Sequence, residues 1–292
     1  MDTSAPQPIS DGRKSGCLYL VATPIGNLED ITVRALRILG EADLIACEDT
    51  RQTAKLLRHY SLDKKTVSYH EHNEMTRAAE LVIRMEEGDN VALVTDAGTP
   101  GISDPGQHLV SLCLRHHILI VPIPGPSAVI AALAASGLPT EEFLFVGFLP
   151  SRGGERRKTL ERLASEPRTL VFYESPRRLA DTLAAALDLF GRRQAVIARE
   201  LTKIHEEFLR GDLAELLVRV RQQPPRGEIT LLIGAAAPGQ LPVTDLPPTP
   251  LHERVEQIML EKNIDRKAAL KIAARERGLN KREAYKQLLM SR

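Results

Sequence analysis

The sequence is poor in cysteine and contains no long hydrophobic run. Its 292 residues include three widely spaced cysteines (Cys17, Cys47 and Cys113), with no CxxC pair and no Cys/His cluster at zinc spacing. This usage predicts reduced, half-buried thiols, as in a cytosolic protein. The longest stretch of small apolar residues, 128–135, is far shorter than a membrane span. The first 16 residues are polar and unlike a signal peptide. We therefore expect a soluble cytoplasmic protein with no membrane partner.

The sequence also carries little net charge. The 39 Lys and Arg residues against 38 Asp and Glu leave +1, which excludes a uniformly basic coat for nucleic acid. Hydrophobic residues make up 43% and charged residues 26%, which is the balance of a globular protein rather than a disordered one. The length is typical of two domains.

Several familiar catalytic fingerprints are missing. The loop after the first expected strand reads TPIGNL, with one glycine where a Rossmann dinucleotide site has GxGxxG. The same difference argues against the common methyltransferase fold, whose first loop is also glycine-rich. The motifs GxxxxGK[ST], GxSxG and HExxH do not occur. P-loop, serine-hydrolase and zinc-protease functions therefore have no support.

What the sequence does contain is an alternation of short apolar runs with amphipathic stretches. Expected strands lie at 17–22, 43–47, 66–69, 90–95 and 118–123, with helices at 30–39, 50–59, 74–87 and 106–116. This order favours a parallel sheet covered on both faces. A second set has strands at 143–148, 169–173, 195–198, 207–209 and 228–233, with helices at 156–165, 178–190 and 213–222. We expect an α/β fold with a disordered tail (1–16), two α/β domains (17–146 and 147–236), a proline-rich linker (237–250) and a small all-helical module (251–292).

The C-terminal module is basic. From Pro250 to Arg292 there are 11 Lys and Arg against 6 Asp and Glu, a net +5. Asp265 is expected to cap one helix, and Lys267, Lys271 and Arg275 share a face of it at four-residue spacing. Taken alone, such a face is more often a solvated surface than a polyanion site. It favours polyanion binding only if the rest of the chain acts on nucleic acid.

Two irregular loops follow expected strands of the first set. Residues 95–106 contain three glycines and two prolines, and 122–128 read PIPGPSA. Because ligands of open α/β sheets bind at the carboxyl edge of the strands, these loops predict a small-molecule site. We expect Pro126 in the first turn of the next helix, with the amides of that turn facing the site. Neither loop carries Lys or Arg, so a nucleoside fits better than a phosphate-rich cofactor.

Charged clusters follow the second and third expected strands. The first is Glu48-Asp49-Thr50-Arg51 and the second is His70-Glu71-His72-Asn73-Glu74. Thr50 and Asn73 are expected to be helix caps, which leaves the other charged side chains to be explained by function. A metal site from His70 and His72 has only weak support, because no third ligand is evident.

Nine segments identify a family. In order between Leu18 and Ile233 they read VATPIGNLEDIT, ACEDTR, YHEHNE, VTDAGTPGISDPG, PIPGPSA, FVGFLP, FYESPRR, ARELTKIHEE and RGEITLLI. Together they resemble the tetrapyrrole-methylase superfamily, and within it the bacterial RsmI branch. The resemblance implies a 16S rRNA 2′-O-methyltransferase acting on a decoding-centre cytidine. It further implies S-adenosylmethionine (SAM) as cofactor, bound in a cleft between two α/β domains, the small ribosomal subunit as partner, and a homodimer; no DNA partner is expected.

The resemblance also implies which residues contact SAM. These are Pro24, Asp96, Gly98, Thr99, Ile102, Ser103, Ser127, Ala128, Phe148, Tyr173, Ala198, Arg199 and Thr230. Residues 97–100 read Ala-Gly-Thr-Pro where the wider superfamily commonly has SGDP, and this difference argues against a tetrapyrrole substrate.

A ribose hydroxyl is a poor nucleophile, so a base is expected beside it. The catalytic candidates are Glu48, Asp49, Arg51, His72, Glu174 and Glu200, and the sequence does not choose a base among them. The RNA-binding candidates are Arg177, Lys203, Lys267, Lys271, Arg275, Lys281 and Arg282. Two alternatives stay open: a tetrapyrrole C-methyltransferase, and a non-catalytic RNA-binding or ribosome-assembly factor on a methylase fold.

Overall fold

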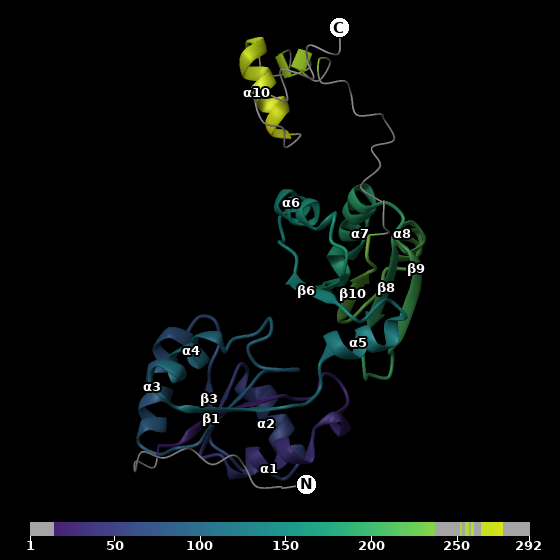
Figure 1. Ribbon diagram of the computed structural model, residues 1–292. Coiled ribbons are helices and arrows are strands. Elements are labelled where there is room, and N and C mark those ends of the chain that lie inside the picture. The colour runs from purple at the N-terminus through teal and green to yellow at the C-terminus, as the bar shows by residue number, and fades with distance from the viewer. Residues whose placement is uncertain (1–14, 237–251, 253–254, 257, 260–263, 277–292) are drawn as a thin grey trace. The chain divides into compact units, whose positions relative to one another are not determined.

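The computed structural model describes residues 15–236, 252, 255–256, 258–259 and 264–276 (Figure 1). The expected N-terminal tail and proline-rich linker fall almost wholly outside these residues. The chain divides into two compact units, one ending at Ala237 and one beginning at Pro238. The first unit contains two five-stranded sheets.

The first sheet is entirely parallel, as the sequence predicts. Its strands are β1 (Cys17–Val21), β2 (Leu44–Cys47), β3 (Thr66–Ser68), β4 (Val91–Val94) and β5 (Leu119–Ile123). They are ordered β3-β2-β4-β1-β5, so the carboxyl ends of β1, β4 and β2 lie side by side. This edge places the loops after β1 and β4 next to each other.

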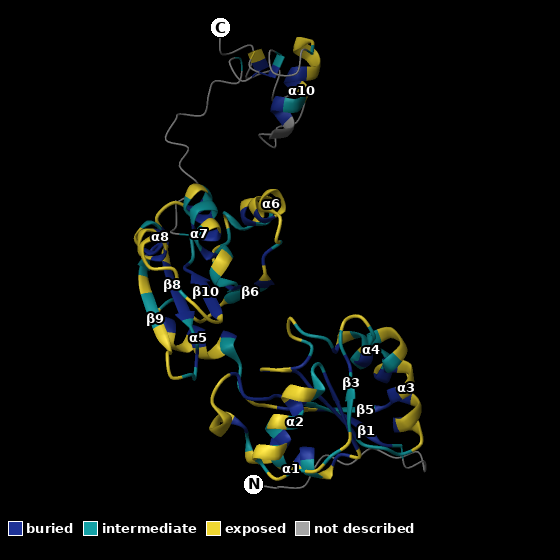
Figure 2. Cartoon of the chain, turned by 180° about the vertical axis from the view of Figure 1, so that it is seen from behind, coloured by how far each residue is buried: buried dark blue, intermediate teal, exposed yellow. Residues whose placement is uncertain are grey.

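Helices cover both faces of this sheet. They are α1 (Val33–Glu41), α2 (Thr50–His59), α3 (Glu74–Glu86) and α4 (Gln107–Arg115). Side chains of a strand alternate between the faces, so Leu93 packs in a cluster with residues of α3 and α4, whereas Ala92 packs in a cluster with residues of α1 and α2. Figure 2 shows buried strands between helices whose outer sides are exposed. The three cysteines are buried rather than half-buried.

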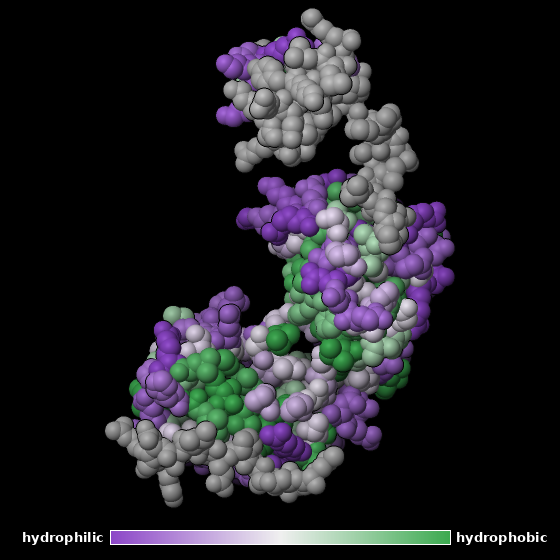
Figure 3. Space-filling view, viewed as in Figure 1, coloured by the Kyte–Doolittle hydropathy of each residue, from purple (hydrophilic) through white to green (hydrophobic). Residues whose placement is uncertain are grey.

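The second sheet is mixed. Its strands are β6 (Phe143–Phe148), β7 (Thr169–Glu174), β8 (Gln194–Arg199), β9 (Glu207–Asp212) and β10 (Ile229–Ile233), in the order β6-β7-β10-β8-β9. Strand β10 is antiparallel to both β7 and β8. One face is covered by α6 (Gly153–Leu163), α7 (Pro176–Phe190) and α8 (Leu213–Gln222). Figure 3 shows that the outer surface of α6 is hydrophilic.

The other face of the second sheet is covered by α5 (Ala128–Ser136), which follows β5 of the first sheet. Its residues Val129, Ala132 and Leu133 pack in one cluster with Val171 and Leu232. The chain therefore crosses to the second sheet between Ile123 and Ala128, and the expected boundary at 146/147 falls inside β6. The predicted boundary is too late because α5 is apolar on all sides. Its sequence therefore has no periodic pattern that would show which sheet the helix packs against.

The second unit contains α10 (Arg266–Glu276). The Asp265 carboxylate accepts a hydrogen bond of 2.7 Å from the Ala268 amide, which confirms it as the helix cap. Leu270 and Ala273 pack against Val255 and Ile258. Within the described part of the chain, no helix is long and apolar enough to cross a membrane.

Candidate active site

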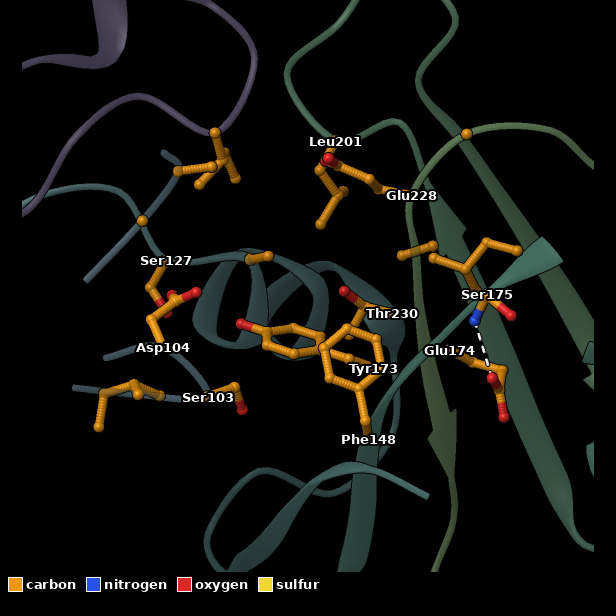
Figure 4. A pocket seen from close by; sticks show the side chains of 18 of the residues that line it. Ser103, Asp104, Ser127, Phe148, Tyr173, Glu174, Ser175, Leu201, Glu228 and Thr230 are labelled. Carbon is orange, nitrogen blue, oxygen red and sulfur yellow. Dashed lines mark hydrogen bonds between the residues drawn. The ribbon is translucent and has the colours of Figure 1, made fainter. Parts of the chain in front are cut away.

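A cavity of about 380 Å³ takes its walls from both sheets. Figure 4 shows Ser103, Asp104 and Ser127 on one side, the rings of Tyr173 and Phe148 beside them, and Leu201 and Glu228 at another wall. Most of the lining comes from loops at strand ends. The lining residues are Ile25, Ala97, Gly98, Thr99, Ile102, Ser103, Asp104, Ser127, Ala128, Phe148, Tyr173, Glu174, Ser175, Pro176, Ala198, Leu201, Gly227, Glu228, Ile229 and Thr230.

The loop after β4 is held against the loop after β1 by backbone hydrogen bonds. Thr23 and Gly98 exchange two such bonds, of 2.9 and 3.0 Å, and the Thr23 hydroxyl donates to the Thr95 carbonyl at 3.0 Å. Gly98 has φ +86°, a conformation that L side chains rarely adopt. A glycine therefore lets the loop turn back to β1 and present residues 97–104 to the cavity.

The loop between β5 and α5 forms the adjacent wall. The cap of α5 is Ser127, not Pro126, so the predicted position of the proline in the first helical turn is wrong. Gly125 lies so close to β1 that an added Cβ would be 2.9 Å from the Cβ of Ala22. The first amides of α5 have no carbonyl partner within the helix. Ser127 and Ala128 bring this end of the helix to the cavity.

The second sheet contributes an aromatic wall. The rings of Phe148 and Tyr173 lie 5.5 Å apart between centroids, and Phe148 is 59% exposed. A large apolar ring left open to solvent beside a cavity is available for contact with a flat ligand. Burial raises the pKa of Tyr173, so its hydroxyl is protonated at neutral pH.

A third wall is held by an ion-pair network. Lys203 pairs with Glu200 and with Glu228, each at 3.0 Å. The Glu200 carboxylate also accepts a 2.9 Å hydrogen bond from the Glu228 amide, and this bond lowers its pKa. Glu200 and Lys203 therefore fix the backbone at Gly227 and Glu228, which line the cavity. Glu200 does not line it, and its carboxylate is committed to this loop.

Glu174, another expected base, is a structural carboxylate. Its side chain has no exposed surface, and its oxygens accept hydrogen bonds from the Ser175 amide, the Arg178 guanidinium and the Thr182 hydroxyl at 2.6–2.9 Å. Figure 4 shows the carboxylate directed away from Asp104 and Ser103. Because both oxygens are occupied, we do not propose Glu174 as a base.

Carboxylates gather where β2 and β4 end. Asp49 caps α2 and holds Arg51 at 2.7 Å, and the hydrogen bonds from Arg51 keep the Asp49 pKa at about 2. Thr50, the expected cap, is the first helical residue instead. The Asp96 carboxylate accepts a 3.2 Å hydrogen bond from the Asp49 amide. Burial raises the pKa of both Glu48 and Asp96.

Asp104 belongs to the same acidic region and lies in the cavity wall. Burial, followed by the charges of Glu48 and Asp96, raises its pKa to about 6. The sequence analysis placed Asp104 in the predicted ligand loop but did not name it as a site residue. Its position directly after Ser103 could have suggested it, but no sequence pattern showed that Glu48 and Asp96 would lie near it.

The expected cofactor residues fall into two groups. Those in the cavity wall are Gly98, Thr99, Ile102, Ser103, Ser127, Ala128, Phe148, Tyr173, Ala198 and Thr230. Pro24 and Asp96 do not line the cavity. Arg199 does not line it either, because its guanidinium bonds Glu207 at 2.6 Å and the Arg226 carbonyl at 3.3 Å. Besides Asp104, the lining residues that sequence reasoning missed include Ile25, Leu201, Gly227 and Glu228.

The remaining expected residues are scattered. His72 is exposed, with its ring 5.9 Å from that of His70, and among the described residues no group of three or more His, Cys, Asp or Glu could hold a metal ion. Asn73 occupies the cap position of α3 without a side-chain capping bond. Arg177 is exposed on α7. Lys267 and Lys271 are exposed on α10, which also contains Arg275. Lys281 and Arg282 lie outside the described residues.

Known proteins match both the sequence and the fold. The profile of the Tetrapyrrole (Corrin/Porphyrin) Methylases matches residues 17–217. A protein of Halalkalibacterium halodurans named ribosomal RNA small subunit methyltransferase I is 48% identical over 274 residues, covering 92% of this chain and 93% of that one. Its namesake in Escherichia coli O157:H7 is 44% identical, covering 96% and 97%.

Two solved structures show the same fold. The methyltransferase CobJ aligns with a TM-score of 0.59 at 21% identity, covering 78% of this chain and 97% of that one. Uroporphyrin-III C-methyltransferase from Thermus thermophilus, complexed with S-adenosylhomocysteine, aligns with a TM-score of 0.54 at 22% identity, covering 75% and 97%. The chain therefore belongs to the tetrapyrrole (corrin/porphyrin) methylase family, in the branch of the proteins named ribosomal RNA small subunit methyltransferase I.

Proposed function

We propose that this protein transfers a methyl group from SAM to the 2′-hydroxyl of a cytidine in small-subunit ribosomal RNA. The observation that carries the donor assignment is the chemistry of the cavity. Of the described residues that line it, none is Lys, Arg or His, whereas Asp104, Glu174 and Glu228 carry carboxylates. A cavity whose lining carries negative charge attracts a cationic sulfonium and repels a phosphate-bearing cofactor. Its volume of about 380 Å³ lies in the range of small-molecule sites.

Different walls of the cavity are proposed to contact different parts of SAM. The exposed Phe148 ring and Tyr173 offer an apolar surface for the adenine. Gly98 and Thr99, together with the first turn of α5, supply backbone groups for the polar parts of the nucleoside. SAM supplies an electrophilic methyl group. Rigid loops that hold this group in line with an incoming oxygen contribute to the rate through positioning.

The acceptor assignment rests on the relatives and on the C-terminal unit. Relatives 42–52% identical to this chain are named for small-subunit ribosomal RNA. Lys267 and Lys271 lie one turn apart on α10 and are exposed, whereas Leu270 and Ala273 of the same helix are buried. This arrangement gives α10 a basic outer face, which we propose contacts the RNA backbone.

The basic face can be tested by charge reversal. The double variant Lys267→Glu/Lys271→Glu should weaken binding to small subunits and flatten its dependence on salt, because each lost phosphate contact removes roughly 0.7–0.9 from the log–log slope. Glu155→Lys on the exposed surface of α6 is a control for altered charge. An unchanged slope in the double variant would refute the contact.

The reaction is tested with labelled SAM and small subunits that lack the modification. The expected product, after digestion to nucleosides, is labelled 2′-O-methylcytidine, and subunits that are already modified should take up no label. SAM binding without label in subunits, naked RNA or assembly intermediates would favour a small-molecule acceptor such as a porphyrinoid. Failure to bind SAM would favour a non-catalytic RNA-binding factor.

We further propose that the protein is a cytoplasmic homodimer. Large apolar side chains are exposed on the neighbouring helices α3 and α4 of the first domain, among them Ile83 (54%) and Leu114 (61%). Figure 3 shows a hydrophobic area on the visible side of this domain. Exposed apolar surface of this kind is typical of interaction sites. Light scattering after size-exclusion chromatography should give twice the chain mass of 32.2 kDa.

A further inference from the structure

A second cavity adjoins the first. It has a volume of about 610 Å³ and opens beside the loop after β4 and the start of α4. Its lining residues are Glu71, Glu74, Gly101, Ser103, Asp104, Pro105, Gly106, Gln107, His108 and Ser111. Ser103 and Asp104 line both cavities. They therefore form the wall across which a group bound in one cavity meets a group bound in the other.

We propose that the second cavity receives the acceptor nucleotide and that Asp104, in the shared wall, accepts the proton of its 2′-hydroxyl. This inference rests on the proposed function. As the carbon–oxygen bond forms, the carbon–sulfur bond of the donor breaks with its electron pair left on sulfur, and the hydroxyl proton passes to the Asp104 carboxylate. That proton later leaves to solvent, which restores the base.

The geometry distinguishes Asp104 from the other carboxylates near the site. Both oxygens of Glu174 accept hydrogen bonds, and the Asp49 carboxylate pairs with the Arg51 guanidinium. Glu200 accepts hydrogen bonds at Oε1 from Lys203 and from the Glu228 amide, and it does not line the cavity. Asp104 has no hydrogen bond or ion pair with any residue in the part of the chain that the structure describes. Its carboxylate is half-buried at the cavity wall (Figure 4) and so is free to accept a proton from a bound substrate.

The surroundings of Asp104 suit a base that works near neutral pH. Burial is the main cause of its raised proton affinity, and the nearby carboxylates Glu48 and Asp96 add to it, so that the pKa of Asp104 is about 6. A base of this strength is ionised at pH 7 yet binds a proton more readily than an ordinary aspartate. The other titratable groups in the two linings are the Tyr173 hydroxyl and the side chains of Glu71, Glu74, Glu174, Glu228 and His108.

The second cavity also fits one part of a nucleotide better than another. Glu71 and Glu74 give it negative charge, which repels phosphates. Carboxylates accept hydrogen bonds from the exocyclic amino group of cytosine. The base and ribose are thus expected inside, with the phosphates at the outside.

The test uses the full-length protein, labelled SAM and unmodified small subunits under single-turnover conditions. Asp104→Asn keeps the shape of the side chain but removes the base, so methyl transfer should slow by about 10²–10⁴-fold. SAM affinity, measured by calorimetry, should fall far less than the rate, because Glu228 still gives the cavity negative charge. Asp104→Ser is made alongside, so that a folded variant without the carboxylate is available. Glu87→Gln, at the exposed end of α3, is the matched control and should be fully active.

The pH profile and a cavity variant separate the possible outcomes. The wild-type rate should rise with pH and level off above about 6, whereas the Asp104 variants should lose this rise. Ser111→Phe, which narrows the second cavity, should raise the KM for subunits without changing SAM affinity. A rate within tenfold of the wild type, or a fall explained by lost SAM affinity, would overturn the role of Asp104. An unchanged KM in Ser111→Phe would overturn the acceptor cavity. A wild-type protein that does not label RNA would overturn both the inference and the proposed function.

Discussion

Replacing Thr182, which does not itself line the cavity, by valine should destabilise the first unit. Thr182 is fully buried on α7, and its hydroxyl donates a 2.6 Å hydrogen bond to the buried Glu174 carboxylate. Valine keeps the shape of the side chain and leaves that oxygen without its donor. A hydrogen bond to a charged group contributes about 1.5–3 kcal/mol to stability. Taking about 2 kcal/mol, and about 2–4 °C per kcal/mol for a unit of this size, Tm should fall by about 4–8 °C.

The assay is thermal unfolding followed by circular dichroism without ligand. Thr159→Val on α6 is the matched control, because the Thr159 hydroxyl donates to the Glu155 carbonyl on an exposed surface. Its stability should change by less than about 0.5 kcal/mol. If the Tm of Thr182→Val stays within about 1 °C of the wild type, the buried Glu174 carboxylate does not need the hydrogen bond from Thr182 for the stability of the fold. Its carboxylate would then be available for the chemistry that we exclude.

Three further predictions concern the cavity. Gly227→Ala should lower Tm and weaken SAM binding, because φ at this position is +87° and the new Cβ would clash with the Glu200 carboxylate. Normal Tm and normal SAM affinity would show that the loop adapts. Phe148→Ala should weaken SAM binding about tenfold, because it removes about 1.4 kcal/mol of ring contact, and it should change the Tm of the ligand-free protein little. SAM affinity is measured by calorimetry, and an unchanged affinity would show that Phe148 does not contact SAM. Asp104→Asn should be more stable than the wild type above pH 6 but not below pH 4. The folded pKa of about 6 exceeds the unfolded value, so the wild type loses stability as pH rises between the two, whereas asparagine does not titrate; parallel Tm curves at all pH values would contradict this.

The loops of the site could be found from the sequence because their signals are local. A run such as residues 95–106, rich in glycine and proline after an apolar strand, cannot continue as strand or helix, and the parallel topology places it at the ligand edge. For this reason the loops at 95–106 and 122–128 were expected at a ligand site, and Gly98, Ser103 and Ser127 of these loops lie in the cavity wall.

The roles of the carboxylates could not be found in this way. Glu174, Glu200 and Asp104 all stand in polar segments at strand ends, and their sequence surroundings are alike in kind. What distinguishes them is the set of donors that folding brings to each. Glu174 accepts hydrogen bonds from Arg178 and Thr182 of α7, and Glu200 accepts one from the Glu228 amide. Asp104 accepts none from the residues that the structure describes.

The sequence by itself determined the element order, the parallel first sheet and the loops that form the ligand edge, because strand periodicity, glycine and proline act over a few residues. The tertiary structure alone decided that α5 crosses to the second sheet and that β10 runs antiparallel. It also decided that two cavities meet at Asp104. These features depend on contacts between segments far apart in the chain. Burial and the approach of like charges set the pKa of Asp104, and neither is encoded near residue 104.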